Sequence, residues 1–344
     1  MNLRWFDAHL DLAYMAEAGR DMQAEPGVCG GADLPASVTF PALADARVTH
    51  CLGTIFTEAD GDKSQPHTYP AHDPEAANAA GVRQLKRYRQ WGAGHFYRRQ
   101  LGADPDAIIR PPARDEAPDA LILIEGADPI LDPADLPEWR AEGVVAVGMA
   151  WWKPSRYAGG NGSSTGLTDA GRALVKAMDA TGLVHDASHL SDRSFADLLE
   201  LTDRPVIASH SNCRALMGGG SFGENQRHLA DEQIRAIVAR GGLVGINLYS
   251  KFLNPRILTP EDGRASFADV LAHIRHVCDL ANDRAHVGLG SDMDGGFSAA
   301  RLPAGIDGPG DLFRLAEALA ADGWSDAEVR GFAFDNWARF WHIA

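Results

Sequence analysis

Eight short apolar runs, separated by amphipathic stretches and loops, constrain this chain more than any other feature of its 344 residues. The runs are rich in Val, Ile and Leu, which is typical of strands that are covered on both faces. Strands that alternate with helical patterns predict a parallel sheet, and eight strands predict a TIM (β/α)8 barrel. A doubly wound open sheet is the alternative that a strand count leaves open. The predicted strands are 6–12, 48–56, 121–126, 144–151, 183–189, 205–211, 243–249 and 286–292.

The segments between these runs divide into amphipathic stretches and loops. Helices are predicted at 74–101, 168–181, 191–202, 230–240, 265–282, 309–322 and 326–342. Three other segments, 57–72, 153–167 and 214–228, are rich in Gly, Ser and Pro and are too long for simple turns. Long loops in compact domains usually carry function, so we expect these three at the active site. Composition does not shift along the chain, which predicts a single domain over residues 1–344.

Polar residues interrupt the apolar runs mainly where a strand ends. They are His9 and Asp11 on the first strand, Glu125 on the third, His189 on the fifth, His210 on the sixth and Asp292 on the eighth. The carboxyl ends of barrel strands meet on one face, where catalytic residues gather. We therefore expect these six side chains to lie near one another.

Three imidazoles and two carboxylates without a thiolate form a ligand set typical of zinc or a similar divalent metal. His9 and Asp11 are two positions apart, so on one strand they share a face with Cα atoms roughly 6–7 Å apart. Glu125 has two carboxylate oxygens and can bridge two ions about 3.5–4 Å apart. A single buried His is more often a hydrogen-bonded core residue. The metal hypothesis therefore depends on these groups occurring together.

The charge balance narrows the partners. A formal net charge of −15 argues against nucleic acid and anionic membranes, and an anionic substrate group would need a dedicated local cation. Four scattered cysteines without a Cys-x-x-Cys pair indicate reduced thiols. Neither a leader nor an apolar run approaching about 18 residues is found, so we expect a cytoplasmic protein without a membrane anchor.

Sequence motifs add a resemblance to a known family. The chain carries, in this order, DAHLDL, IEGAD, GLTDAG, HDASHLSDRSF, PVIASHSNCRAL, QRHLADEQ, GGLVGIN, HVGLGSDMDGG and DNWARFW. Each motif is weak alone, but their order and spacing resemble the renal or membrane dipeptidase family, binuclear zinc hydrolases of the amidohydrolase superfamily. The match covers nearly the whole chain.

The resemblance implies a role for each site residue. His9 and Asp11 would hold one zinc and His189 and His210 the other, with Glu125 and a water or hydroxide shared between the two. Asp292 would handle the proton, Arg227 would bind the substrate carboxylate, and Trp151 and Tyr249 would contact the substrate. The chemistry is consistent, because two zinc ions lower the pKa of a shared water and stabilise the developing oxyanion. The arginine fork fits a carboxylate.

Two positions depart from the family pattern. The family has a His after strand four, where this chain has Trp151, and an indole donates one hydrogen bond and carries no charge. A loop residue (Lys153, Arg156 or Tyr157) supplies the missing function, or the substrate differs from ordinary dipeptides, or the loop is misaligned. His185 stands where the family has an aliphatic residue. It is either a support for His189 or a satisfied core histidine.

These observations predict a zinc-dependent dipeptidase that uses a metal-bridging hydroxide. Its substrate would be a dipeptide with a free C-terminal carboxylate on an L- or D-residue. The second enzymatic hypothesis is an amidohydrolase acting on an N-acyl amino acid or another small amide. A catalytically silent barrel retained as a scaffold is the alternative from a different class. The sequence permits a homodimer without specifying one.

Overall fold

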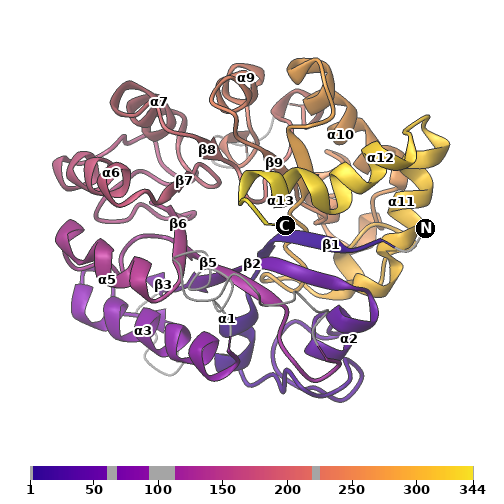
Figure 1. Cartoon of the computed structure of the whole chain (residues 1–344), viewed down its shortest axis with the longest axis horizontal. Helices are drawn as coiled ribbons and strands as arrows, with labels where there is room; N and C mark the ends of the chain where they lie inside the picture. Colours follow the sequence, from indigo (N-terminus) through magenta and orange to yellow (C-terminus); the bar gives the residue numbers. More distant parts are fainter. Residues whose placement is uncertain (1–2, 60–67, 93–112, 219–224, 344) are drawn as a thin grey trace.

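The computed structural model describes residues 3–59, 68–92, 113–218 and 225–343, and its strands form a ring with helices around it (Figure 1). The fold is the predicted α/β barrel of the TIM type. The barrel strands are β1 (Trp5–Leu10), β2 (Val48–Phe56), β5 (Asp119–Glu125), β6 (Val144–Gly148), β7 (Val184–Asp186), β8 (Val206–Ile207), β9 (Val244–Ile246) and β10 (Val287–Leu289). All eight lie where strands were predicted.

The strands follow one another around the ring in chain order. Six form a continuous parallel ladder in the order β1-β2-β5-β6-β7-β8, and β9 pairs with β10. A parallel bridge between Ala208 and Val244 joins the two groups. The ring closes where the Asp292 N–H donates to the His9 carbonyl at 3.3 Å and the Ser291 N–H donates to the Asp7 carboxylate at 2.8 Å.

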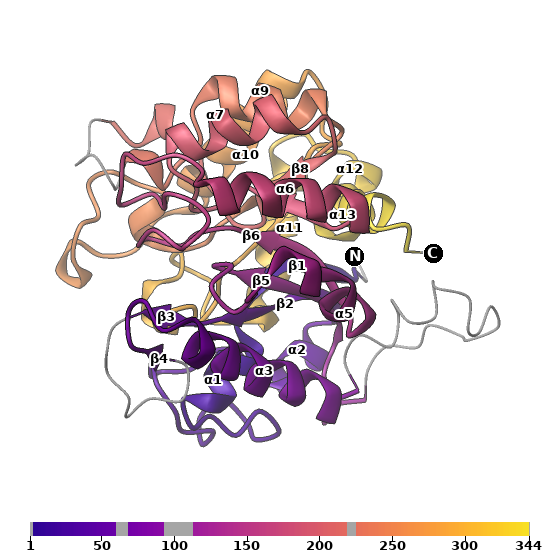
Figure 2. The same cartoon turned by 90° about the vertical axis from the view of Figure 1, so that its left-hand side faces the viewer.

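Helices cover the outside of the ring. Figure 2 shows α1 (Leu12–Glu17), α2 (Phe40–Asp45) and α3 (Pro74–Gln90) on one side and α6 (Asp169–Thr181), α7 (Asp192–Leu201), α9 (Asp231–Ala239) and α10 (Phe267–Ala281) on the other. The remaining helices are α5 (Leu136–Ala141), α11 (Leu312–Ala321), α12 (Asp326–Arg330) and α13 (Asn336–Phe340). Local sequence fixes several ends: Thr168 and Ser191 cap the starts of α6 and α7, and Gly182 ends α6 at φ +71°.

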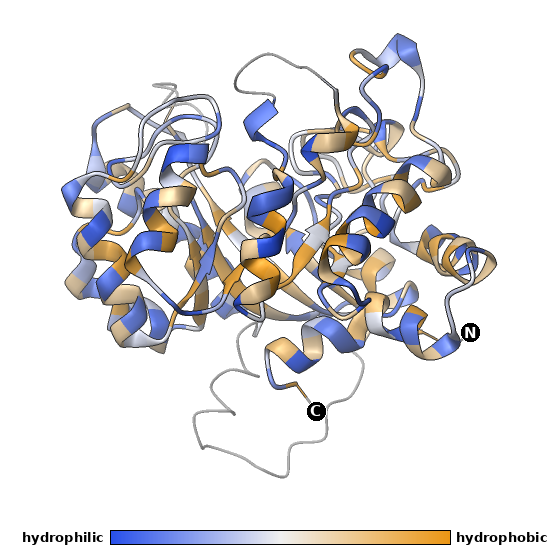
Figure 3. Cartoon of the chain, turned by 90° about the horizontal axis from the view of Figure 1, so that it is seen from above, coloured by the Kyte–Doolittle hydropathy of each residue, from blue (hydrophilic) through white to orange (hydrophobic). Residues whose placement is uncertain are grey.

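The core has two layers because successive strand residues face opposite sides. Figure 3 shows apolar strands inside helices whose outer faces are hydrophilic. On β5, Leu121 and Leu123 belong to the cluster inside the barrel, whereas Ile122 and Ile124 pack against the outer helices. Glu125 follows on the inner side of this alternation, which directs its carboxylate into the mouth of the barrel.

Several predicted boundaries were wrong. Strand β7 ends at Asp186 and β8 at Ile207, so His189 and His210 lie in turns beyond the strands. Asp11 likewise lies beyond the end of β1 and immediately precedes α1. The predicted helix at 326–342 is three pieces, because a π-helical turn at Gly331–Asp335 separates α12 from α13. The short helices α1, α2 and α5 were missed.

Parts of other predictions lie outside the described residues. These are 93–101 of the helix predicted at 74–101, 60–67 of the loop 57–72 and 219–224 of the loop 214–228. The described ends of loop 57–72 include a small ladder of β3 (Glu58–Ala59) and β4 (Thr68–Tyr69). The four cysteines are separate thiols, and none of the described helices is long and apolar enough to cross a bilayer. The single domain stays a prediction.

Candidate metal centre

The six polar residues predicted at the strand ends converge at the carboxyl end of the barrel. Each follows or ends a different strand, except His9 and Asp11, which share β1 and the turn after it. Their exposed fractions are all below 10%. They are His9, Asp11, Glu125, His189, His210 and Asp292.

Two sets of donor atoms meet at Glu125. On one side, His9 Nε2 lies 3.3 Å from Glu125 Oε2 and 3.6 Å from Asp11 Oδ1. On the other, His189 Nε2 and His210 Nε2 lie 3.2 and 3.5 Å from Glu125 Oε1. The donor atoms within each set lie within 4.8 Å of one another. One carboxylate therefore belongs to two groups of metal-ligating side chains.

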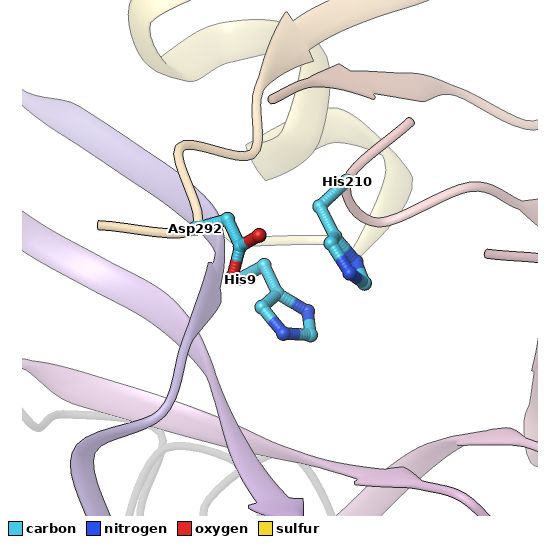
Figure 4. Close-up of side chains that lie close together, drawn as sticks. All are labelled: His9, His210 and Asp292. Carbon is cyan, nitrogen blue, oxygen red and sulfur yellow. The ribbon is translucent and has the colours of Figure 1, made fainter. Parts of the chain in front are cut away.

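A third group includes Asp292. Figure 4 shows its carboxylate beside the rings of His9 and His210, which stack with centroids 3.5 Å apart. One donor atom of each of these three residues falls within the same 4.8 Å limit. Asp292 therefore lies at the metal-ligand cluster although its chain segment is more than 280 residues from His9.

The donor set fits divalent cations because too many hydrogen-bond acceptors face one another. Burial lowers the pKa of His189 to about 4 and holds that of His210 well below its usual value, so both imidazoles are neutral near pH 7. Their Nε2 atoms nevertheless lie 3.0 Å apart, and His9 Nε2 has no hydrogen-bond partner in the described chain. A cation satisfies such lone pairs, and nitrogen and carboxylate ligands suit zinc.

Neighbouring groups fix which imidazole nitrogen faces the cluster. The Ser209 hydroxyl donates to Asp186 Oδ2 at 2.6 Å, so its oxygen accepts from His210 Nδ1 at 2.8 Å and His9 Nδ1 at 3.3 Å. Asn161 Oδ1 accepts from His189 Nδ1 at 2.8 Å. Protons on the three Nδ1 atoms direct each Nε2 toward the cluster, which is how partners of metal-binding histidines commonly act. Burial opposes the charge of His9, but Glu125 and Asp11 raise its pKa well above the usual value, so a bound cation would take the place of the proton on its Nε2.

Asp292 is held in a strained and buried position. It has φ +59°, and its Oδ2 accepts a hydrogen bond from the Asn247 side-chain amide at 2.8 Å. Burial raises the pKa of Asp292 to about 8, and the charge of Asp11 adds to the rise. A Cβ at Gly295 would meet Asp292 Oδ1 at 2.0 Å, so the turn admits only glycine there without movement. The close packing defines where the carboxylate sits.

The turn that carries Asp292 is anchored by a buried carboxylate. Asp294 accepts hydrogen bonds from the backbone N–H groups of Ser37 and Val38, both at 2.8 Å, and pairs with the buried guanidinium of Arg20. These contacts attach the segment 20–38 to the turn after β10. They fix the backbone two residues from Asp292.

Arg227 lies beside the cluster as a buried cation. It is 5% exposed, donates from Nη2 to the His210 carbonyl at 2.8 Å and packs 5.0 Å over the ring of Phe252. Its Nε has no hydrogen-bond partner among the described residues. A guanidinium with a free donor at the edge of a buried cavity can bind an anionic group.

A cavity of about 420 Å³ lies over these groups and has an aromatic side. Trp151 packs edge-on to Phe56 with ring centroids 5.0 Å apart, and Tyr249 stacks on Phe297 at 4.4 Å. Both predicted substrate contacts, Trp151 and Tyr249, line the cavity. The aromatic rings can accommodate an apolar part of a ligand.

None of the loop residues considered as substitutes for the family histidine belongs to the described lining of this cavity. Lys153 is exposed and donates to the Ala59 carbonyl at 2.9 Å, and Arg156 donates to the Ile130 carbonyl at 2.5 Å. The Tyr157 hydroxyl also donates to Ile130, at 2.6 Å. Of these residues and Trp151, only Trp151 is part of the described lining of the cavity.

His185 does not support His189. Its Nε2 contacts Asp179 Oδ1 at 2.8 Å, at the helix layer outside β7. The idea that His185 and His189 share a face of one strand was wrong, because His189 lies beyond the strand at φ +65°. His185 is a core histidine that is hydrogen-bonded through Nε2, but it is not fully satisfied, because its buried Nδ1 has no partner among the described residues.

Sequence reasoning missed the residues that orient the cluster, which are Ser209, Asn161 and Asn247. Asn247 interrupts the apolar run LVGINLY, a signal of the same kind as those at the other strand ends. Ser209 precedes His210 and differs little from the neighbouring serines. Asn161 lies in a Gly- and Ser-rich loop where a polar residue is ordinary, so only the folded arrangement distinguishes it.

The family model described as membrane dipeptidase (peptidase family M19) matches residues 2–344. A Klebsiella pneumoniae protein from the 5′ region of pqqA is 32% identical over 213 residues, which cover 60% of this chain and 74% of that protein. A dipeptidase of Schizosaccharomyces pombe is 28% identical over 182 residues, 53% of this chain and 41% of that protein.

A solved structure shares the fold. A metallopeptidase from Rhodobacter sphaeroides, bound to a phosphinate mimic of the dipeptide L-Ala-D-Ala, superposes with a TM-score of 0.77 at 22% sequence identity. The alignment covers 99% of each chain. At 22% identity this structural similarity supports the fold alone. The family assignment instead comes from the match of the family model to residues 2–344.

Proposed function

Because this chain belongs to the membrane dipeptidase family and is one of its metal-dependent hydrolases, we propose that it cleaves the single peptide bond of a dipeptide with a free C-terminal carboxylate. The observation that carries this proposal is Glu125, because its Oε2 faces His9, which lies beside Asp11, and its Oε1 faces His189 and His210. A site of this kind suits two cations rather than one.

We assign His9, Asp11 and Glu125 to one zinc ion and Glu125, His189 and His210 to the other. When bound, such an ion pair supplies a Lewis acid for the substrate carbonyl and an acidified water as nucleophile. The protein's own contribution begins with orientation, because Ser209 and Asn161 hold the three imidazoles with Nε2 toward the cluster. Burial excludes bulk water from these contacts.

Asp292 is the residue that handles the proton in this proposal. Its carboxyl group lies within reach of the cluster, and the Asn247 amide holds one of its oxygens. Next to bound cations the carboxyl would stay ionised at neutral pH despite its burial, so that the other oxygen can take a proton from the attacking water and return it to the leaving amine. Cleavage of an amide needs this return, because the amine leaves poorly without a proton.

Arg227 binds the C-terminal carboxylate of the substrate. Its guanidinium lines the same cavity, and its Nε has no protein partner among the described residues. A planar fork offers two parallel hydrogen bonds to a carboxylate, at a site where a net charge of −15 otherwise repels anions. Tyr249 and Trp151 contact the rest of the substrate.

The second candidate substrate is an N-acyl amino acid, and the position of Trp151 favours it. An indole beside Phe56 offers an apolar surface where the family has an imidazole. Glu58 also lines the cavity, however, and a carboxylate there favours the free amino group of a dipeptide. The two substrates differ in that amino group alone, so they can be compared directly.

The test is a substrate panel with the zinc-loaded protein. We expect turnover of L,L- or L,D-dipeptides with a free carboxylate, and loss of turnover when that carboxylate is amidated. Arg227→Gln should raise KM by about 10- to 100-fold, the value of a lost charge-assisted bond pair. Exclusive turnover of N-acyl amino acids would select the second candidate.

Two controls separate the enzyme from a silent scaffold. Asp292→Asn should retain the metal while losing turnover, and unchanged turnover would remove Asp292 from the mechanism. About two zinc ions per chain and inactivation by a chelator support the enzyme. A fully folded protein that takes up no metal would support the scaffold. A homodimer and a cytoplasmic location stay predictions from the sequence, to be tested by solution mass and by fractionation.

A further inference from the structure

A second cavity, of about 680 Å³, lies at the opposite end of the barrel from the metal centre. Its wall includes residues that come just before strands, such as Leu183 before β7, Pro205 before β8 and His286 before β10. Helix α13, which crosses the ring in Figure 1, and the residues after it line the cavity as well. The cavity is therefore built by the amino ends of the strands.

The lining of this cavity is strongly cationic. It contains four arginines and two histidines, and no aspartate or glutamate among the described residues that line it. The chain as a whole has 47 acidic residues against 32 Lys and Arg, so a wall of this composition differs sharply from the average. The basic residues are Arg140, Arg204, Arg240, Arg339, His286 and His342.

Three of the guanidinium groups, those of Arg204, Arg240 and Arg339, have hydrogen-bond donors beyond the ones that the chain uses. Arg204 and Arg240 each donate from Nη2 to a carbonyl at the end of α6 or α7, at 3.3 and 3.2 Å. Arg339 donates to the Ala285 carbonyl at 3.1 Å and to the Asn336 side chain at 3.2 Å. A guanidinium has five N–H donors, and bonds to carbonyls leave its charge uncompensated.

Two of the arginines, Arg240 and Arg339, keep a positive charge without a carboxylate partner among the described residues. Arg240 Nε is buried and has no hydrogen-bond partner in the described chain. The charge of Arg204 is partly balanced by Asp179, and His286 Nε2 lies 3.7 Å from Asp283 Oδ2, whereas Arg240 and Arg339 contact only carbonyl and amide oxygens among the described residues. The cavity therefore combines volume, positive charge and free donors.

We propose that this cavity binds a small molecule carrying a phosphate group and an apolar or aromatic part. Arginine forks match phosphate oxygens in pairs, and several arginines around one cavity suit a dianion better than a monoanion. The other part of the wall is apolar and includes Val145, Leu243, Phe340 and Trp341. A bare inorganic anion would leave that surface uncovered.

The ligand binds independently of the dipeptide, because the two cavities share none of their described lining residues. The proposal therefore does not rest on the hydrolase activity. The alternative explanation is that these arginines only cap the carbonyl ends of α6 and α7, which would stabilise the helices without binding a ligand. The experiment must separate binding from capping.

The probe is phenyl phosphate, titrated calorimetrically into the metal-loaded full chain at constant ionic strength. We expect one saturable site, and binding at least about tenfold weaker in the double variant Arg240→Gln/Arg339→Gln, which loses two charge-assisted contacts. Inorganic phosphate should bind more weakly than phenyl phosphate. The matched control is Arg275→Gln/Arg314→Gln, which removes the same charge from two half-exposed, ion-paired arginines and should leave binding unchanged.

The variant Arg227→Gln distinguishes the two ends of the barrel. Binding that survives Arg227→Gln and fails in the double variant supports the proposal, whereas binding lost in Arg227→Gln would place the probe at the metal centre and overturn it. Absence of saturable binding, or equal loss in the Arg275/Arg314 control, also overturns it. If the double variant folds poorly, the single change Arg339→Gln at an exposed residue should weaken binding in the same direction.

Discussion

A carboxylate contacts an imidazole at each end of the barrel, and the two contacts differ in kind. At the amino end, Asp179 Oδ1 lies 2.8 Å from His185 Nε2, and the same oxygen accepts a bond from Thr202 at 2.9 Å. At the carboxyl end, Glu125 faces three imidazole nitrogens at 3.2 to 3.5 Å, and two of these nitrogens lie 3.0 Å apart.

The two contacts differ in how well hydrogen-bond donors and acceptors are matched. The Asp179 contact is matched, because His185 Nε2 and the Thr202 hydroxyl both donate to Asp179 Oδ1, although the buried Nδ1 of His185 has no partner among the described residues. At the Glu125 cluster, His189 and His210 are neutral, and their Nε2 lone pairs face each other because their Nδ1 atoms are protonated toward Asn161 and Ser209. Burial makes such an arrangement costly unless a cation binds there. Counting protons at a buried cluster thus distinguishes a structural contact from a metal site.

The largest expected effect comes from removing one carboxylate at each end. Glu125→Gln should abolish tight binding of both metal ions and lower activity by more than about 100-fold. Loss of a residue that only supports a metal ligand typically lowers metal affinity or activity by about 10- to 100-fold, and loss of a ligand should exceed that range. Asp179→Asn should lower the free energy of unfolding by about 1 kcal/mol and leave metal content unchanged. Metal analysis and denaturant unfolding of both variants test whether the two carboxylates differ in this way. Loss of metal from Asp179→Asn as well would contradict the distinction.

The next effect concerns one glycine at each end. Gly295→Ala places a Cβ against the Asp292 carboxylate, and a displacement of that group should lower kcat by about 100-fold. Gly182→Ala, at φ +71°, meets only the flexible end of Arg140 and should cost about 1 kcal/mol of stability without affecting kcat. Steady-state kinetics and thermal unfolding measure both. Equal kinetic effects would show that position relative to Asp292 is irrelevant.

A smaller effect is expected from two buried serines. Ser209→Ala removes the acceptor that orients His9 and His210 and should weaken metal binding by about 10- to 100-fold. Ser194→Ala also removes a buried hydroxyl, which bonds the Gly159 carbonyl at 3.0 Å, but it lies away from the imidazoles. Competition with a chelator gives both affinities. A similar change in the two variants would assign the Ser209 effect to general destabilisation.

The smallest effect concerns His273, a buried histidine of α10 that is not part of the metal-ligand cluster. Burial lowers the pKa of His273 to about 4, and both of its nitrogens bond the backbone, at Cys213 and Leu253. The unfolded chain therefore takes up the proton first as pH falls below about 6.5, and stability falls toward pH 4. His273→Gln should reduce the slope of unfolding free energy against pH by at most about 1.4 kcal/mol per unit over that range. An unchanged slope in urea unfolding between pH 4.5 and 6.5 would contradict this.

The spacing of apolar residues and the positions of polar residues within the apolar runs predicted most of the barrel and of the candidate site. All eight strands lie where apolar runs indicated them, because a strand covered on both faces must be apolar over its whole length. Polar residues at the ends of such runs are exceptional, and so His9, Glu125 and His210 were recognisable. Short helices such as Leu12–Glu17 carry too few turns for a period to emerge, which is why they were missed.

The parts that depend on backbone direction could not be predicted. His185 and His189 are four positions apart, and an extended strand would place them on one face. His185 instead faces Asp179 from within β7, and the turn after Asp186 directs His189 toward Glu125. A positive φ at His189 is a property of the folded turn and leaves no periodic signal.

The sequence by itself determined the barrel, the metal-ligand residue types and the family, because each follows from residue identity and spacing along one chain. Only the tertiary structure decided that Glu125 faces two ligand sets, that Ser209 orients two imidazoles, and that four arginines gather at the opposite end. These relations join segments up to about two hundred residues apart, and their energy depends on distances and shared protons, which exist only once the ring has closed.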